Sequence, residues 1–340
     1  MRRATRTDVA RAAGVSAYTV SVVLNDPRYG RVGAETRERV RRVADSLGYR
    51  PQAAGRALRL GRSELIAYVS TPELLHHVGS YHGALLPALL SAANDAGYEL
   101  AIVGDDREAT LLARLRRAVQ SGRFDGLIVG QPRVDDPVLA LLEDAGLPYV
   151  LAGEHPDGAL CQVVRDGFAM AADVAERVRA AGHRRVGVLE GDPAWERQWF
   201  NRRRRLGLAH VLGAGAVLDL PPDPRAALAA ARRRRLTALV AGSDGDAAAL
   251  LTAAAAAGVA VPGDLSVVSL YAVRAPAPTV PSLASLCVDP SDVGRQAVRL
   301  LARRIAGAAP DPPRTVLPYW WVAGHSLGPP PVAHREEAPG

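Results

Sequence analysis

The sequence contains no lysine, only two cysteines and no long apolar run. Cys161 and Cys287 are too few for a disulfide framework, so we expect both to pack in the core. No apolar stretch reaches the roughly 20 residues of a membrane-spanning helix, and no signal-peptide apolar region follows the first residues. We therefore expect a soluble, cytoplasmic protein.

Motifs for catalysis and for metal binding are also missing. We find no nucleophile elbow, Walker A loop, H-E-x-x-H or C-x-x-C. His76 and His77, with His82 nearby, suggest a metal site, but adjacent histidines point to different faces and lack further ligands at suitable spacing. We expect no enzyme activity, no cofactor and no metal. A transport-associated binding protein would need a signal peptide, which disfavours that alternative.

Positive charge is unevenly distributed, although the 340 residues together carry +7. Residues 1–63 hold 14 arginines against 5 acidic residues, whereas the remainder holds 28 against 30. A small basic segment on a nearly neutral body is typical of nucleic-acid-binding proteins. The length predicts two or three domains, and an apolar content of 48% allows substantial cores.

The stretch Thr5–Asn25 predicts two short helices that meet at a tight turn. Thr5 and Asp8 have the spacing of a capping box, and Gly14 permits the sharp turn because it lacks a Cβ. Ser16 is a good N-cap for the second helix. The pattern is that of a helix-turn-helix, whose second helix enters the DNA major groove, although an ordinary helical hairpin fits the spacing too.

The second of these helices has two chemically different sides. Its buried stripe follows helical spacing and comprises Val20, Val23 and Leu24. Its other side carries Ala17, Tyr18, Ser21 and Val22. A third helix is expected from about Ala34 to Leu47, ended by Gly48.

The run DVARAAGVSAYTVSVVLN closely resembles the headpiece of the lactose-repressor (LacI/GalR) family of bacterial transcription regulators, which reads roughly DVA-x-x-AGVS-x-x-TVS-R-VLN. Later segments resemble the family as well: AAGHRRVGVLEG, Arg204 with Gly207, VPGDLSVVSL and VDPSDVGRQAVRLL. The resemblance implies a regulator, in particular a repressor, that binds a near-palindromic operator in double-stranded DNA as a homodimer. A small molecule, such as a sugar or a related metabolite, would control it.

The DNA-binding residues follow from the same comparison. Candidates for phosphate contacts are Arg6, Ser16, Thr19, Ser21, Asn25, Arg28 and Arg31. The base-reading positions implied by the family are Ala17, Tyr18 and Val22. Many relatives carry arginine at the last position, whereas valine can only pack on a thymine methyl. Leu58 stands where the family inserts a leucine into the minor groove, although a plain basic linker is the simpler alternative.

Strands and helices alternate from Glu64 onward and predict an α/β core with parallel sheets. The expected fold is an all-α helix-turn-helix headpiece plus a periplasmic-binding-protein-like core of two parallel-sheet subdomains. The expected boundaries are a headpiece at 1–48, a hinge helix or linker at 49–62, a core at 63–327 and a disordered tail at 328–340. Within the core we expect a first subdomain at about 63–157 plus 289–318, and a second at 158–288 plus 319–327.

The cleft between the two subdomains is the expected ligand site. The family resemblance places around it Tyr81, His82, Asp166, Arg204, Asp244 and Tyr271. Tyr271 stands where an aspartate is usual, and Gly153-Glu154 where Asp-Arg is common. These departures leave four alternatives open: a sugar, a less usual compound, a larger compound or no ligand. The arginine runs at 202–205 and 232–235 suggest a second nucleic-acid site, but we expect pocket and surface positions instead.

Overall fold

The computed structural model describes residues 4–25, 32–50, 61–70, 80–105, 107–189, 199–309 and 313–331. The chain divides into two compact units, Met1–Glu64 with Gly122–Asp125, and Leu65–Ser121 with Gly126–Gly340. Asp125 belongs with the first unit because its carboxylate accepts hydrogen bonds from the N–H groups of Ser63 and Glu64, at 2.6 and 2.9 Å.

The headpiece contains helices α1 (Arg6–Ala13), α2 (Ala17–Asn25) and α3 (Ala34–Ser46). The capping box expected before α1 is confirmed, because the Asp8 N–H donates to Thr5 Oγ1 at 3.3 Å and the Thr5 N–H to Asp8 Oδ2 at 2.9 Å. Gly14 takes the left-handed conformation, with φ +64°, at the turn. Ser16 Oγ accepts the Thr19 N–H at 3.0 Å and so caps α2.

One valine from each helix fills the centre of the headpiece. Val9, Val20 and Val40 are fully buried and pack with Val23 and Ala44. Their helical spacing produces the apolar stripes that face one another. The cluster is small, so the headpiece has a thin core.

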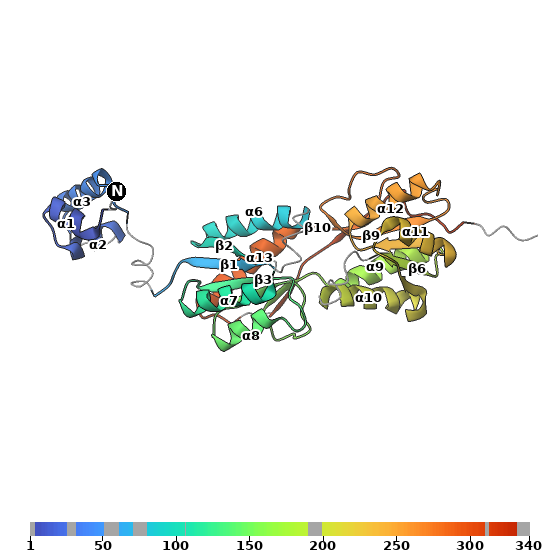
Figure 1. The fold of residues 1–340 in the computed structure, drawn as a ribbon, viewed down its shortest axis with the longest axis horizontal. Coiled ribbons are helices and arrows are strands. Elements are labelled where there is room, and N and C mark those ends of the chain that lie inside the picture. Colours follow the sequence, from blue (N-terminus) through green and yellow to red (C-terminus); the bar gives the residue numbers. More distant parts are fainter. Residues whose placement is uncertain are drawn as a thin grey trace, which may run out of the picture. The chain divides into compact units, whose positions relative to one another are not determined.

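The first subdomain of the core is a parallel sheet with strand order β11-β5-β4-β3-β1-β2. Its strands are β1 (Leu65–Val69), β2 (Glu99–Val103), β3 (Gly126–Gly130), β4 (Tyr149–Ala152), β5 (Gln162–Val164) and β11 (Arg314–Val316). Its helices are α6 (Ser80–Asp95), α7 (Glu108–Gln120), α8 (Pro137–Asp144) and α13 (Pro290–Ile305). Figure 1 shows α6 and α8 on opposite sides of these strands.

The second subdomain is a similar sheet with strand order β12-β10-β9-β8-β6-β7, in which only the β10–β12 pair is antiparallel. Its strands are β6 (Val186–Leu189), β7 (Val217–Asp219), β8 (Ala238–Ala241), β9 (Ser266–Val273), β10 (Ala284–Val288) and β12 (Trp320–Val322). Its helices are α9 (Gly167–Ala180), α10 (Trp199–Leu212), α11 (Pro224–Arg233) and α12 (Asp244–Ala256), with a 3-10 turn, η2 (Ala214–Ala216).

Helices cover both faces of the second sheet. Leu239 of β8 packs in a cluster with α11 and α12, whereas its neighbours Ala238 and Val240 pack in a cluster with α9 and α10. Successive strand residues point to opposite faces, so β8 is apolar throughout. This explains why its sequence is a continuous apolar run.

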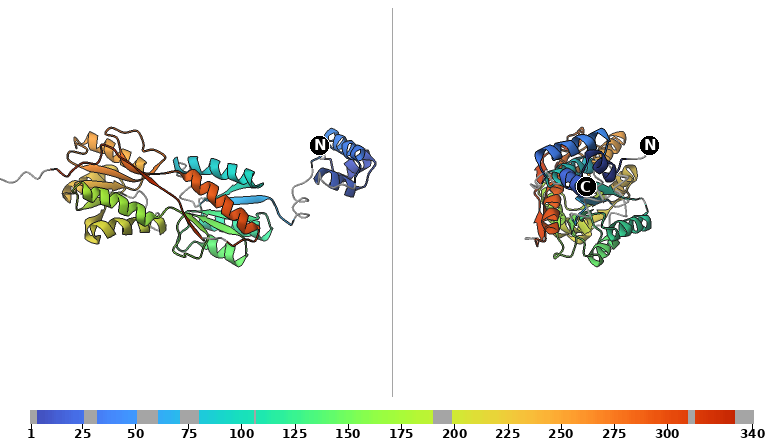
Figure 2. Two further views of the ribbon diagram at one scale, coloured as in Figure 1. Left: turned by 180° about the vertical axis from the view of Figure 1, so that it is seen from behind. Right: turned by 90° about the vertical axis from the view of Figure 1, so that its left-hand side faces the viewer.

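The chain crosses between the two sheets three times, after β5, after β10 and between β11 and β12 (Figure 2). The expected end of the first subdomain near residue 157 is wrong, because β5 still pairs with β4 and β11 of the first sheet. A strand of three residues is too short to show a periodic pattern.

The expected disorder after Leu327 is wrong at Gly328. The Gly328 N–H donates to Ser266 Oγ at 3.1 Å, and its carbonyl oxygen lies 2.9 Å from His183 Nε2. The proline-rich composition predicted a disordered tail from residue 328. The buried polar side chains of His183 and Ser266 instead form hydrogen bonds with the backbone of Gly328. Residues 332–340 lie outside the described part of the chain.

Candidate DNA-reading helix and ligand cleft

Helix α2 presents a large aromatic side chain to solvent. Tyr18 is 67% exposed, whereas Ala17 is half-buried and packs against the headpiece core. Ser16 is exposed at the start of the helix, and its Oγ lies 2.9 Å from Thr19 Oγ1. Hydroxyl groups and N-terminal N–H groups can bind phosphate oxygens, and an exposed ring can reach base edges.

Val22 is more buried than we expected, and its role in reading bases remains a prediction. It is only 6% exposed, although we expected it on the open side beside Tyr18 as a base-reading residue. Val22 does not belong to the headpiece core cluster, in agreement with the predicted buried stripe of α2, which does not include it. Helical periodicity identifies the side of a helix that meets the main core, but it does not show what covers the other side.

The structure describes the side chains of only two of the remaining DNA-binding candidates. Arg6 is exposed in the first turn of α1, and Ser21 is half-buried on α2. Outside the described residues lie Arg28, Arg31, Leu58 and the side chain of Asn25. Their roles remain predictions.

Two of the expected ligand-binding residues line a cavity in the core. Tyr81 of α6 and Tyr271 of β9 come from different subdomains, and their ring centroids are 6.0 Å apart. The cavity also contacts Gln131, Arg165 and Phe200 and has a volume of about 50 Å³. This is room for a few water molecules, so a sugar-sized ligand requires movement of the walls.

The other expected ligand-binding residues do not line this cavity. His82 is buried with its ring edge-on to Tyr81. Arg204 is 2% exposed and donates to the Gly242 carbonyl oxygen at 2.5 Å. The Asp244 carboxylate accepts the Ala277 N–H at 3.1 Å, and burial raises its pKa. Their contact with a ligand, like that of Asp166, remains a prediction.

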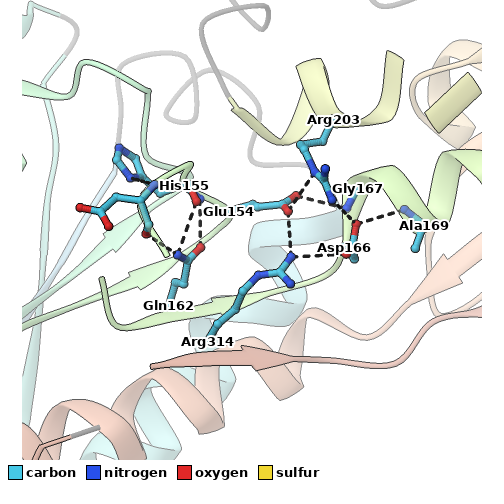
Figure 3. A network of polar contacts seen from close by, with 9 residues as sticks. Glu154, His155, Gln162, Asp166, Gly167, Ala169, Arg203 and Arg314 are labelled. Atoms are coloured by element: carbon cyan, nitrogen blue, oxygen red, sulfur yellow. Dashed lines mark hydrogen bonds and ion pairs between the residues drawn. The ribbon is translucent and has the colours of Figure 1, made fainter. Parts of the chain in front are cut away.

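A network of charged side chains joins the two subdomains at the cleft (Figure 3). Glu154, after β4, is 4% exposed, and its Oε1 lies 2.9 Å from Arg314 Nη2 and 3.4 Å from Arg203 Nε. Its Oε2 accepts the Gly167 N–H, at the start of α9, at 3.2 Å. Asp166 pairs with the same two arginines, at 3.0 Å from Arg203 and 3.5 Å from Arg314.

The two carboxylates have opposite pKa shifts. Burial raises the pKa of Glu154, and the Gly167 N–H and Arg203 only partly oppose it. Burial also acts on Asp166, but the Ala169 N–H and both guanidinium groups together hold its pKa below the usual value. Asp166 caps α9, and a helix N-terminus favours the ionised form.

The segment that carries Glu154 is itself fixed by Gln162 of β5. The Gln162 side chain accepts the His155 N–H at 3.0 Å and donates to the Asp157 carbonyl oxygen at 2.9 Å. Sequence reasoning missed Glu154 as a binding-site residue and noted it only as a departure from the family pattern. Its partners are distant along the chain, so no local spacing indicates them.

The arginine run at 202–205 divides between the cleft and the surface. Arg203 joins the network and Arg204 is buried, whereas Arg205 pairs with the exposed Asp219. The second run, 232–235, is exposed at the end of α11. The expected surface positions are confirmed for 232–235, whereas the expected pocket position of Arg204 remains a prediction.

Two family models match the chain. One, described as bacterial regulatory proteins of the lacI family, matches residues 5–52, and the other, a periplasmic binding protein-like domain, matches residues 175–327. The chain belongs to the LacI family of bacterial transcriptional regulators.

Relatives of this LacI-family chain include HTH-type transcriptional regulators. It is 29% identical over 342 residues to CelR of Thermobifida fusca, a match that covers 93% of this chain and 96% of CelR. It is 31% identical over 185 residues to RafR of Escherichia coli, and there the match spans about half of each protein, 53%. The LacI-family chain is thus a DNA-binding transcriptional regulator.

Solved LacI-family structures share the fold. The lac repressor dimer bound to operator and the anti-inducer ONPF has a TM-score of 0.77 at 22% identity, covering 96% of this chain and 100% of that one. The CelR–cellobiose complex has a TM-score of 0.67 at 25% identity, covering 95% and 100%. In the described part of the chain, no helix is long and apolar enough to cross a membrane.

Proposed function

We propose that this LacI-family protein is a repressor that binds a near-palindromic operator as a homodimer, and that a small molecule in the cleft changes its affinity for DNA. One observation carries the proposal: α1 and α2 form a capped helix-turn-helix that exposes Tyr18 on the outer side of α2. In this motif the second helix enters the major groove.

The dimer follows from the small size of the DNA-reading surface. One headpiece reads only a few base pairs, so recognition of one site in a genome requires two copies at a fixed spacing. The lac repressor, a structural relative, has been solved as a dimer on its operator. We propose that the core forms the dimer here and that the protein acts in the cytoplasm.

The cleft supports control by a small molecule. Its walls come from both subdomains, so a ligand that binds there favours one relative arrangement of the two sheets. DNA affinity then changes by the difference between the ligand's affinities for the two arrangements. CelR has been solved with cellobiose, which supports a sugar or a related metabolite. We propose no catalysis, since the relatives are regulators.

Selection of bound duplexes from a random DNA library tests the proposal. The full-length protein should enrich a sequence with two-fold symmetry, and light scattering should show two copies per duplex. Enrichment of no sequence, or binding of a single copy to an asymmetric site, would overturn the proposal. The selected duplex then serves to measure operator affinity with and without sugars such as cellobiose.

A further inference from the structure

Arg165 occupies a special position at the hinge of the core. It directly follows β5, at the first crossing between subdomains, and is 6% exposed. Its Nε donates to the Pro318 carbonyl oxygen at 3.4 Å, and its Nη2 donates to the Asp289 carbonyl oxygen. These acceptors lie on the other two crossings, so one guanidinium links all three.

Hydrogen bonds to two carbonyl groups do not neutralise a buried charge. They use two of the five N–H donors of Arg165. Among the residues that the structure describes, no carboxylate forms an ion pair with this guanidinium. A buried charge without a counter-ion is unfavourable, and Arg165 lines the cleft cavity.

Tyr271 provides a second unmatched group in the same cavity. Its Oη is buried and has no hydrogen-bond partner within the described parts of the chain. Burial raises its pKa well above the usual value, and the nearby charge of Arg165 opposes this rise. The phenol stays protonated at neutral pH, so it can donate a hydrogen bond to a ligand.

The carboxylate of Glu154 does not balance these donors. Its oxygens already accept from Arg314 and the Gly167 N–H and pair with Arg203. Asp166 is shared between the same arginines. Within the described residues, both carboxylates of this network therefore pair with Arg203 and Arg314, and neither pairs with Arg165.

We infer that the small molecule that binds in this cleft carries a carboxylate, which pairs with Arg165 and accepts a hydrogen bond from Tyr271. Guanidinium–carboxylate pairs combine charge with matched geometry, so they discriminate strongly against neutral analogues. Phe200, Val163 and Val293 line the same cavity and suit an apolar part of the ligand. This inference rests on the proposed function of the cleft and specifies the chemical class of its ligand.

Matched pairs of acids and amides test the inference on the full-length protein. Acetate against acetamide probes the cavity as it stands, and D-glucuronate against D-glucuronamide probes a sugar-sized ligand. At constant ionic strength, at least one acid should raise the unfolding temperature by about 2 °C or more, and its amide should not. Titration calorimetry should show the acid binding at least about 10-fold more tightly than the amide.

Three variants assign the effect to the cleft. Arg165→Met should abolish the preference for the acid, and Tyr271→Phe should reduce it. The second variant removes only a hydroxyl without a described partner, so it remains informative if Arg165→Met fails to fold. Arg233→Met, which changes an exposed arginine on α11, should keep the full preference.

Three outcomes would overturn the inference. They are equal stabilisation by acid and amide, an acid preference that survives both cleft variants, and no stabilisation by either acid at tens of millimolar. If cellobiose or another neutral sugar changes operator affinity while no acid preference exists, the ligand-controlled regulator stands and only the carboxylate assignment fails. If the unsubstituted protein binds no operator at all, that result would instead count against the proposed function.

Discussion

Arg203 Nε lies 3.4 Å from Glu154 Oε1, and this ion pair joins α10 of the second subdomain to the segment after β4 of the first. Arg314, from the first sheet, contacts the same oxygen at 2.9 Å. One buried carboxylate thus holds arginines from both subdomains. The relative arrangement of the sheets at the cleft is stabilised by charge as well as by the chain crossings.

Glu154→Gln should lower the free energy of unfolding of the core by about 1–3 kcal/mol, because it leaves two guanidinium groups with less compensation in a buried site. Chemical denaturation followed by tryptophan fluorescence measures the change. The control is Glu176→Gln, whose exposed pair with Arg179 should contribute less than about 0.5 kcal/mol. Equal effects of both substitutions would contradict the role of the network.

Gly207→Ala should destabilise the second subdomain strongly. A Cβ at Gly207 of α10 would lie 2.2 Å from the Phe168 carbonyl oxygen and 3.0 Å from the Ala171 Cβ, both of α9. The two helices must separate to accept a methyl group, at a cost of about 2 kcal/mol or more. Gly245→Ala, in α12, is the matched control, since its nearest neighbour lies at 3.7 Å. A thermal unfolding temperature unchanged by Gly207→Ala would refute the close approach.

His183 should make stability depend on pH below its usual pKa of 6.5. Burial lowers the pKa of His183, although its hydrogen bond with the Gly328 carbonyl opposes the shift. The unfolded state therefore binds the proton first, so stability is complete above pH 6.5 and falls as the pH decreases towards the folded-state pKa.

Urea denaturation at several pH values measures this dependence. His183→Gln should reduce the slope below pH 6.5. His210→Gln, which changes an exposed histidine, should leave the slope intact. A slope that is the same in His183→Gln and in the unsubstituted protein would show that other groups cause it.

Tyr18→Ala should weaken operator binding without affecting the fold. The side chain is 67% exposed, so its removal costs little stability, whereas loss of a base contact typically costs about 1–3 kcal/mol. Fluorescence anisotropy with the selected operator measures this as a roughly 10-fold or greater rise in Kd. Tyr18→Phe separates the ring from the hydroxyl. Unchanged affinity in Tyr18→Ala would remove Tyr18 from the DNA-reading surface.

Local patterns predicted the headpiece well because short-range interactions form it. The Thr5–Asp8 capping box and the Ser16 cap each lie within one helical turn. Val20 and Val23 bury the expected stripe. Val22 shows the limit of this reasoning, because it is only 6% exposed although it lies outside the stripe that helical spacing predicts.

In the core, too, local patterns predicted some features and missed others. Alternating strands and helices predicted the parallel sheets, because buried parallel strands are continuous apolar runs that end in turns. The three-residue strands β5, β11 and β12 lack such a pattern, so the sequence misplaced the first subdomain boundary.

By itself the sequence determined the type of protein: a basic helix-turn-helix followed by a two-part α/β core. Local residue spacing and family motifs predict both parts. Only the tertiary structure decided which groups meet in the cleft. Arg165 faces Tyr271 and Tyr81 there, and Glu154 meets Arg203 and Arg314. The physical reason is that three separate chain crossings bring these residues together. Ion pairs between residues so far apart along the chain produce no regular spacing in the sequence.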